Sequence, residues 1–490
     1  MNPRTRLALA ILAISLSLGI LGDLLLRTDE HGLNLTLWLS TGLLAAAALA
    51  TLMEEKPDRP ALGLAVVAFG FAGALSWRAS PTLEVLNFLS AALLAACAAA
   101  RAHGHSFWRA GLAEQWARLV RPGLHAVAGV LAFVRAGIQL PPPATPGKGR
   151  VAVRAVAGVV IALPLLLVFG GLFMEADLAF RSIVERLLDI DLALIVQHVV
   201  FTLWLTWLTS GALVFLLLSR PGDRGPLTLA QFVRLGPVEI GVALALVNLL
   251  FLGFILVQVR YLFGNADLVR LTPGLTYAEY ARHGFFQLVV VVAIALPMLL
   301  VGDWLLAESR RRAFRAQAAL LVVMLGVVLV SAGWRMRLYQ QAYGWTEQRF
   351  YVTAFLLWLA VTLGGFAFTV LRDRRDLFAG GGIAAGLAFV LALNLINPDA
   401  WIARRNLQLA LRTGDVASCD TEYLGQLGAD AFPVLVEALP DLPPAMRSEV
   451  EARLVKWQSH RTSDWRAWNW GRHRATTVLA RAGVGRGDQP

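Results

Sequence analysis

Runs of about twenty apolar residues recur along almost the whole chain, and they constrain its fold more than any other feature. A helix of that length rises about 30 Å, which matches the hydrocarbon core of a bilayer. Lipid offers no partners for backbone N–H and C=O groups, so a spanning segment must pair its own, as a helix does. The 490 residues include 57% hydrophobic and 16% charged residues, whereas charged residues make up about a quarter of soluble domains. The sequence therefore predicts an all-α, polytopic transmembrane helix bundle.

About eleven segments are long and apolar enough to span. They are 7–26, 33–53, 61–77, 83–100, 153–174, 192–218, 238–259, 284–306, 316–334, 350–371 and 380–396. The first is interpreted as an uncleaved span, because no small-x-small cleavage site follows it. Composition divides the chain into an N-terminal four-span segment, 1–100; a basic amphipathic cytoplasmic segment with a proline-rich linker, 101–150; a seven-span core bundle, 151–396; and a small C-terminal α-helical soluble domain, 397–490.

Basic residues in short loops predict the orientation of the bundle. With the N-terminus inside, the inner segments hold the main basic clusters, such as Arg310, Arg311, Arg312 and Arg315. The C-terminal domain then lies outside the cytoplasm. One segment could reverse the second half of this topology. Residues 124–140 are almost long enough to span, but they carry His125 and Arg135, so we place them on the inner surface.

Several classes of function are disfavoured. The net charge of +11 is spread over short clusters between apolar runs, which is typical of membrane orientation rather than of nucleic-acid binding. Phosphate-loop, dinucleotide, zinc-protease and serine-hydrolase motifs are missing from the sequence. We therefore predict no catalytic residue, no cofactor and no metal site, and the sequence leans away from an enzyme.

The C-terminal residues have the composition of amphipathic helices. Asn397 is a candidate N-cap, Pro398 and Asp399 suit a first helical turn, and Gly414 suits a stop. Further helices are expected in "GADAFPVLVEAL" and "PPAMRSEVEARLVKW", and "DWRAWNWGRHRATTVLA" is expected to form a tryptophan-rich helix. A protein partner could bind such a domain.

Two polar segments interrupt the apolar runs on the predicted outer side. In "LTYAEYARHGFFQL", Thr276 and Glu279 have the spacing of a capping box, which predicts a helix start. In "RMRLYQQAYGWTEQRFY", Gly344 suits a helix stop and Thr346 an N-cap, so the preceding helix should extend about two turns beyond the membrane.

We predict that these segments form an outer polar network, because carboxylates among arginines and tyrosines indicate a paired arrangement. Its candidate members are Tyr277, Glu279, Tyr280, Arg282, His283, Arg335, Arg337, Tyr339, Tyr343, Glu347 and Arg349. The simpler alternative is that these arginines and tyrosines only lie among lipid headgroups. Inside the bilayer, the polar candidates for interhelical hydrogen bonds are His198, Asn248, Gln287, Asp303 and Asn394.

Five segments resemble a family of bacterial polytopic membrane proteins known only as a domain of unknown function. They are "EADLAF" at 175–180, "TYAEYARHGFFQL", "RMRLYQQAYGWTEQRFY", "NPDAWIARRN" at 397–406 and "DWRAWNW" at 464–470, and all lie on the predicted outer side. The resemblance covers roughly residues 150–470. It implies a multi-pass protein of the bacterial inner membrane and brings no reaction, cofactor or catalytic residue.

Three functions stay open. The first is a transporter-like or translocating component with the polar network on its outer face. The second is a non-catalytic envelope sensor or scaffold that binds a partner through its C-terminal domain. The third is a membrane-embedded transferase that acts on lipid-linked substrates, with Asp29, Glu30 or Glu347 as base.

Overall fold

The computed structural model describes residues 3–52, 58–102, 192–218, 237–262, 285–305, 311–413, 421–459 and 464–484. Within these residues the regular elements are helices, so the predicted all-α fold is confirmed. Among the described helices, eight are long and apolar enough to cross a membrane, and Arg59–Ala74 and Gln287–Asp303 are shorter apolar helices. Of the predicted spans, 153–174 lies outside the described residues, as do the segment 124–140 and the linker.

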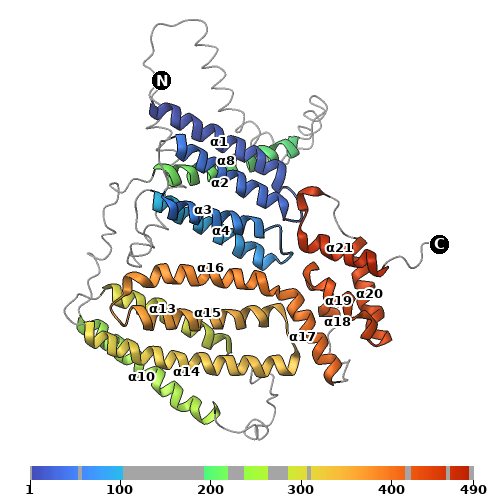
Figure 1. Ribbon diagram of the computed structural model, residues 1–490. Coiled ribbons are helices and arrows are strands. Elements are labelled where there is room, and N and C mark those ends of the chain that lie inside the picture. Colours follow the sequence, from blue (N-terminus) through green and yellow to red (C-terminus); the bar gives the residue numbers. More distant parts are fainter. Residues whose placement is uncertain are drawn as a thin grey trace, which may run out of the picture.

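Two groups of membrane helices lie side by side with their axes roughly aligned (Figure 1). The N-terminal bundle comprises α1 (Pro3–Leu26), α2 (Leu33–Leu52), α3 (Arg59–Ala74), α4 (Pro81–Ala102) and α8 (Leu192–Leu218). The C-terminal bundle comprises α10 (Pro237–Leu262), α13 (Phe285–Leu305), α14 (Arg311–Tyr343), α15 (Glu347–Thr369) and α16 (Phe378–Ile396), with a 3₁₀ turn η3 (Arg375–Leu377) before α16. Although the sequence-based division assigns residues 192–218 to the core bundle, α8 packs against α1 and α2.

Each bundle has its own apolar core. Residues of α10, α13, α14 and α15 form the largest cluster, centred on side chains such as Leu299, Leu321 and Phe366. Ile11, Leu49 and Leu213 belong to a separate cluster of α1, α2 and α8. The bundles meet chiefly along α4 and α16, where Val390 of α16 joins a small cluster of α3 and α4. The molecule therefore has a seam between two bundles, each with a main apolar core of its own.

The remaining helices form a tail at one end of both bundles (Figure 1). It contains α17 (Pro398–Thr413), α18 (Thr421–Leu424), η5 (Ala429–Ala431), α19 (Phe432–Ala438), η6 (Leu439–Asp441), α20 (Pro444–Ser459), η7 (Trp465–Ala467) and α21 (Trp470–Ala482). Its core includes Ile402, Phe432 and Leu435, and it continues into Leu83 of α4 and Phe350 of α15. The tail thus shares a core with the membrane helices.

The turn between α14 and α15 has the predicted local structure. α14 ends at Tyr343, Gly344 has φ of +71°, and Thr346 caps α15 by accepting the Arg349 N–H at 3.3 Å. A left-handed φ suits glycine, since it has no Cβ to clash with the backbone. α14 also extends farther at its start than the predicted span 316–334, because the basic residues from Arg311 continue the helix.

Two other local predictions concern Asn397 and the tryptophan-rich stretch. Asn397 ends α16 in a left-handed conformation and its side chain accepts the Ala400 N–H at 3.4 Å, so it serves two helices. The tryptophan-rich stretch is not one helix: η7 is followed by extended Asn469, whose side chain caps a new helix, α21. α13 stays continuous through Pro297.

Candidate functional site

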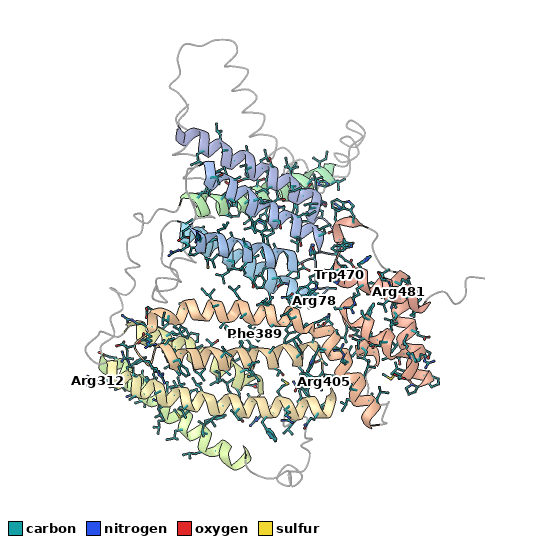
Figure 2. All side chains as sticks on the ribbon, in the orientation of Figure 1. Arg78, Arg312, Phe389, Arg405, Trp470 and Arg481 are labelled. Atoms are coloured by element: carbon teal, nitrogen blue, oxygen red, sulfur yellow. The ribbon has the colours of Figure 1, made fainter. Side chains whose placement is uncertain are left out.

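The strongest concentration of polar contacts lies where the tail meets the ends of the membrane helices. We call this region the joint and define it by the loops 27–32 and 75–80, the start of α15, and the tail residues that contact them. Figure 2 shows Arg78 and Trp470 close to the place where the two bundles and the tail come together. These residues are far apart in sequence and become neighbours only on folding.

The loop between α1 and α2 is held by the last part of the tail. Arg472 donates to the backbone oxygen of His31 at 2.5 Å and its Nε lies 3.4 Å from a Glu30 carboxylate oxygen. The Leu33 N–H donates to the Trp468 oxygen at 2.8 Å. Gly32 has no room for a side chain, since a Cβ there would lie 2.4 Å from that same Trp468 oxygen. Backbone contact on both sides therefore fixes this loop against the tail.

Asn469 connects the tail to the loop between α3 and α4. Its side-chain oxygen caps α21 by accepting the Gly471 N–H, while its Nδ2 donates to the backbone oxygens of Leu75 at 3.2 Å and Arg78 at 2.9 Å. The neighbouring Trp470 N–H donates to the Ser76 oxygen at 2.7 Å. One buried amide therefore satisfies a helix start and two loop carbonyls at once.

Arg78 and Asp430 form the ion pair at the centre of the joint. Their charged groups lie 3.8 Å apart, with side chains 11% and 5% exposed. Asp430 also accepts the Ala79 N–H at 2.7 Å, and the Arg78 Nε donates to the Asn394 oxygen at 2.8 Å. Burial raises the pKa of Asp430, against the lowering effects of the Ala79 N–H and of Arg78. Arg78 thereby connects the tail to both bundles.

Asp399, in the first turn of α17, is a buried acidic residue of the joint. It is 1% exposed, and neither carboxylate oxygen accepts a hydrogen bond from an N–H or O–H donor of the described residues. The acidic side chain of Glu347 lies next to it. Burial first, and then the charge of Glu347 and a hydrogen bond shared with it, raise the pKa of Asp399 to about 8. A buried carboxyl beside a second carboxyl can hold a proton between them.

Tyrosines surround this carboxyl pair. The Glu347 N–H donates to the Tyr423 hydroxyl at 2.5 Å, and the Tyr351 hydroxyl lies 3.1 Å from the Ser80 hydroxyl. Burial raises the pKa of Tyr423 to about 12. The Tyr423 phenol therefore stays neutral and serves as a hydrogen-bonding group at physiological pH.

The structure brings only part of the predicted outer network together. Arg349 lies over the Tyr339 ring at 4.2 Å and the Tyr343 ring at 5.8 Å, and it donates to the oxygens of Tyr343 and Gly344. Arg337 lies over Trp334, with 6.0 Å between the guanidinium carbon and the ring centroid. Arg335 is 9% exposed. Glu347 faces Asp399 and Tyr423 rather than these arginines.

The other predicted members lie outside the described residues. These are Tyr277, Glu279, Tyr280, Arg282 and His283.

Within the membrane helices, several polar contacts connect helices that are distant in sequence. Asn87 of α4 and Asn394 of α16 exchange hydrogen bonds of 3.0 and 2.7 Å across the seam. His198 of α8 lies 2.5 Å from a carboxylate oxygen of Asp23 of α1. Asn248 donates to the Gln317 oxygen at 3.1 Å. Polar side chains are costly in lipid and mark packing contacts or pathways, so the seam pair bears directly on how the bundles fit together.

Sequence reasoning missed most of the joint. The sequence predicts Asp399 only as a residue that suits a first helical turn, and it assigns no contact to Arg78. Asp430, Tyr423 and Asn469 were not singled out. A signal for two of these residues lies in the family-like segments "NPDAWIARRN" and "DWRAWNW", which contain Asp399 and Asn469. No local pattern, however, pairs them with a loop near residue 78.

These observations define an all-α, multi-pass membrane protein with a helical tail docked on the ends of its membrane helices. The chain belongs to the family described as Domain of unknown function (DUF4153), which it matches over residues 60–438. The predicted resemblance to a family of unknown function is thereby confirmed. No curated protein and no solved structure matches the chain.

The family match begins at α3 and ends with α19, so it includes loop 75–80, Glu347, Asp399 and Asp430. The carboxyl pair and the central ion pair therefore lie inside the matched region. α1, α2, α20 and α21 lie outside it.

Proposed function

We propose that the protein is a transporter-like membrane component in which the two bundles flank a path along the α4–α16 seam. In this proposal it resides in a bacterial inner membrane with its N-terminus in the cytoplasm and the tail outside. The observation that carries the proposal is the seam itself. Two bundles with separate apolar cores meet chiefly along one pair of helices, with a buried amide pair between them. Many secondary transporters work by moving one bundle against another.

The position of the tail supports the same function. It contacts loops 27–32 and 75–80 of the N-terminal bundle and α15 and α16 of the C-terminal bundle, all at one end. Separation of the bundles at that end must break some of these contacts. The tail therefore acts as a closure of the outer end, and one member of the predicted outer polar network, Glu347, contacts it through Asp399.

A reversible crosslink across the seam tests this proposal. Asn87→Cys and Asn394→Cys are combined in a chain whose Cys97 and Cys419 are replaced, and the thiols are joined by a short cleavable bis-thiosulfonate. The two single-cysteine chains are matched controls for loss of the amide pair. Metabolite contents of cells and medium are compared across a broad panel among wild type, deletion strain and these variants.

We expect the crosslinked protein to behave like the deletion and to recover when the link is cleaved, while both single-cysteine controls keep the wild-type pattern. If the crosslinked protein supports the same metabolite pattern as wild type, the bundles need not move apart and the proposal fails. A deletion strain with no change in uptake or export also counts against transport.

The sensor or scaffold alternative has a different support. Trp465, Trp468 and Trp470 of the tail are 62%, 41% and 48% exposed, and exposed aromatic side chains are common at protein interfaces. Crosslinking of intact cells, followed by comparison with a chain in which these tryptophans are replaced by serine, tests it. A partner that is lost from the variant favours the scaffold, and unchanged crosslinks refute this use of the tryptophans.

A further inference from the structure

We propose that Asp399 and Glu347 form a proton-binding site at the joint, and that the proton they share keeps the tail docked on the membrane helices. This goes beyond the proposed transport function and does not depend on it, since docking of the tail can be measured without any substrate. The ligand is a proton.

The first argument is the environment of Asp399. Its side chain is enclosed between α17, α15 and the turn that contains Gly428, and it is 1% exposed. Both carboxylate oxygens lack a hydrogen-bond donor among the described residues. A Cβ on Gly428 would lie 2.4 Å from the Asp399 Oδ2, so the tail backbone comes directly against this oxygen. An ionised carboxylate in such a place has lost water without gaining donors, which is costly. A proton removes the charge and supplies the missing O–H donor.

The second argument is the balance of charge around the site. The groups that act on Asp399 are Glu347 of α15 and Asp430 of η5, which are acidic, and Arg78 of loop 75–80, which is basic. Arg78 already makes an ion pair with Asp430 and a hydrogen bond with the Asn394 oxygen.

The remaining titratable neighbours do not neutralise the pair. Tyr351 and Tyr423 sense the charge of Asp399 and are neutral phenols. Arg472 and Arg474 of α21 act on Asp430. Buried Asp399 thus lies against the partly buried Glu347 carboxyl, and no arginine of the described residues forms an ion pair with either group. Like charges so close favour retention of one proton.

A proton fits this space better than a metal ion does. The described residues contain no grouping of three or more His, Cys, Asp or Glu side chains that could hold a metal. Hard cations take about six to eight oxygen ligands, and the tail backbone at Gly428 fills the volume beside Asp399.

The direction of the pH effect follows from linkage. When the tail is undocked, Asp399 is in water and its pKa has the ordinary value of 3.8; when docked, burial raises that pKa to about 8. Docking therefore takes up a proton between these two values. The stabilisation of docking by the shared proton is fully present below about pH 4, declines between about pH 4 and about pH 8, and is lost above about pH 8. Within this range, the docking equilibrium should weaken about tenfold for each pH unit.

Hydrogen exchange of the full chain in nanodiscs tests the inference. Exchange protection of α19, α20 and α21 is measured from pH 5.5 to 9 for wild type and for Asp399→Asn, and the ratio of the two is taken at each pH so that the intrinsic pH dependence of exchange cancels. Asp441→Asn, which changes an exposed carboxyl of the tail, is the matched control.

We expect the wild-type protection, relative to Asp399→Asn, to fall about tenfold per pH unit up to about pH 8 and then to level off. Asp441→Asn should follow wild type. Should Asp399→Asn not fold, Glu347→Gln provides the second comparison, because removal of the neighbouring charge should lower the pH at which protection is lost. A protection ratio that is constant from pH 5.5 to 9 overturns the proposal, and so does protection at fixed pH that depends on sodium or calcium concentration. Altered transport with unchanged tail protection would refute only this inference and leave the proposed function standing.

Discussion

Replacement of Gly428 by alanine should loosen the tail, although its backbone conformation tolerates any residue. Gly428 has φ of −59° and ψ of 163°, a region open to alanine. At such positions a Gly→Ala change ordinarily stabilises a protein by about 0.4–1 kcal/mol, because the unfolded chain loses freedom. Here the new Cβ would lie 2.4 Å from the Asp399 Oδ2 and 3.0 Å from the Ala79 backbone oxygen. The steric conflict with these two oxygens therefore decides the sign of the change in docking free energy.

The magnitude follows from these two opposing effects. Insertion of a methyl group into a packed site costs about 1–3 kcal/mol. The Asp399 side chain is fixed by its surroundings, and the Ala79 oxygen belongs to backbone whose N–H is held by Asp430 at 2.7 Å. Neither neighbour can retreat freely. After subtraction of the entropic gain, we expect a net loss of about 1–2 kcal/mol, which corresponds to a roughly five- to thirtyfold weaker docking equilibrium.

Exchange protection of α19 and α21 at one pH provides the assay. Gly364→Ala is the control, since a Cβ there meets no atom within 4 Å, and a helical position of this kind should be neutral or stabilised. In a chain that already carries Asp399→Ala, the Gly428→Ala change should cost less, because one of its two obstacles is gone. Equal or higher protection in Gly428→Ala than in wild type would refute the packing described for the joint.

Two further changes test other parts of the structure. Asn87→Leu should destabilise the seam by about 1 kcal/mol, since it leaves the Asn394 amide without its reciprocal partner. Replacement of both Asn87 and Asn394 by leucine should cost less than the sum of the two single changes. Thermal unfolding of the purified protein in detergent measures both effects. Arg349→Lys should destabilise the α14–α15 turn by about 1–2 kcal/mol, because lysine cannot both stack on Tyr339 and bind two backbone oxygens as the planar guanidinium does. Faster hydrogen exchange at residues 340–350 measures this loss.

The membrane helices and the α14–α15 turn could be predicted because their signals are local. Apolar length specifies a span, Gly344 specifies a left-handed stop, and Thr346 specifies a cap. Each of these depends on residues within a few positions of one another. The extra turn at the start of α14 was missed because Arg311 to Arg315 are polar, and length was counted from apolar residues alone. Long arginine side chains can extend into the headgroup region while their backbone stays helical.

The joint could not be predicted, because its contacts connect distant parts of the chain. Asp430 binds the Ala79 N–H and pairs with Arg78 across about 350 residues. In the sequence, Asp399 resembles an ordinary acidic residue of a first helical turn. It is buried by contacts with α15 and with the turn that contains Gly428. The outer network was likewise predicted as one group of arginines, tyrosines and glutamates. In the structure Arg349 stacks on Tyr339 and binds the oxygens of Tyr343 and Gly344, whereas the Glu347 side chain lies next to Asp399.

The nature of the contacts at the joint explains why its docking can respond to a single proton. Most of the hydrogen bonds there end on backbone groups of loops 27–32 and 75–80, at the ends of membrane helices where water can replace them on undocking. Such exchanges contribute only about 1 kcal/mol each. The apolar core shared with Leu83 and Phe350 favours docking at every pH. It therefore sets the overall docking equilibrium but not the dependence of that equilibrium on pH. Asp399 alone among these residues combines complete burial with a missing donor. Its protonation state therefore changes the docking free energy, while the surrounding backbone contacts ensure that the tail returns to one position.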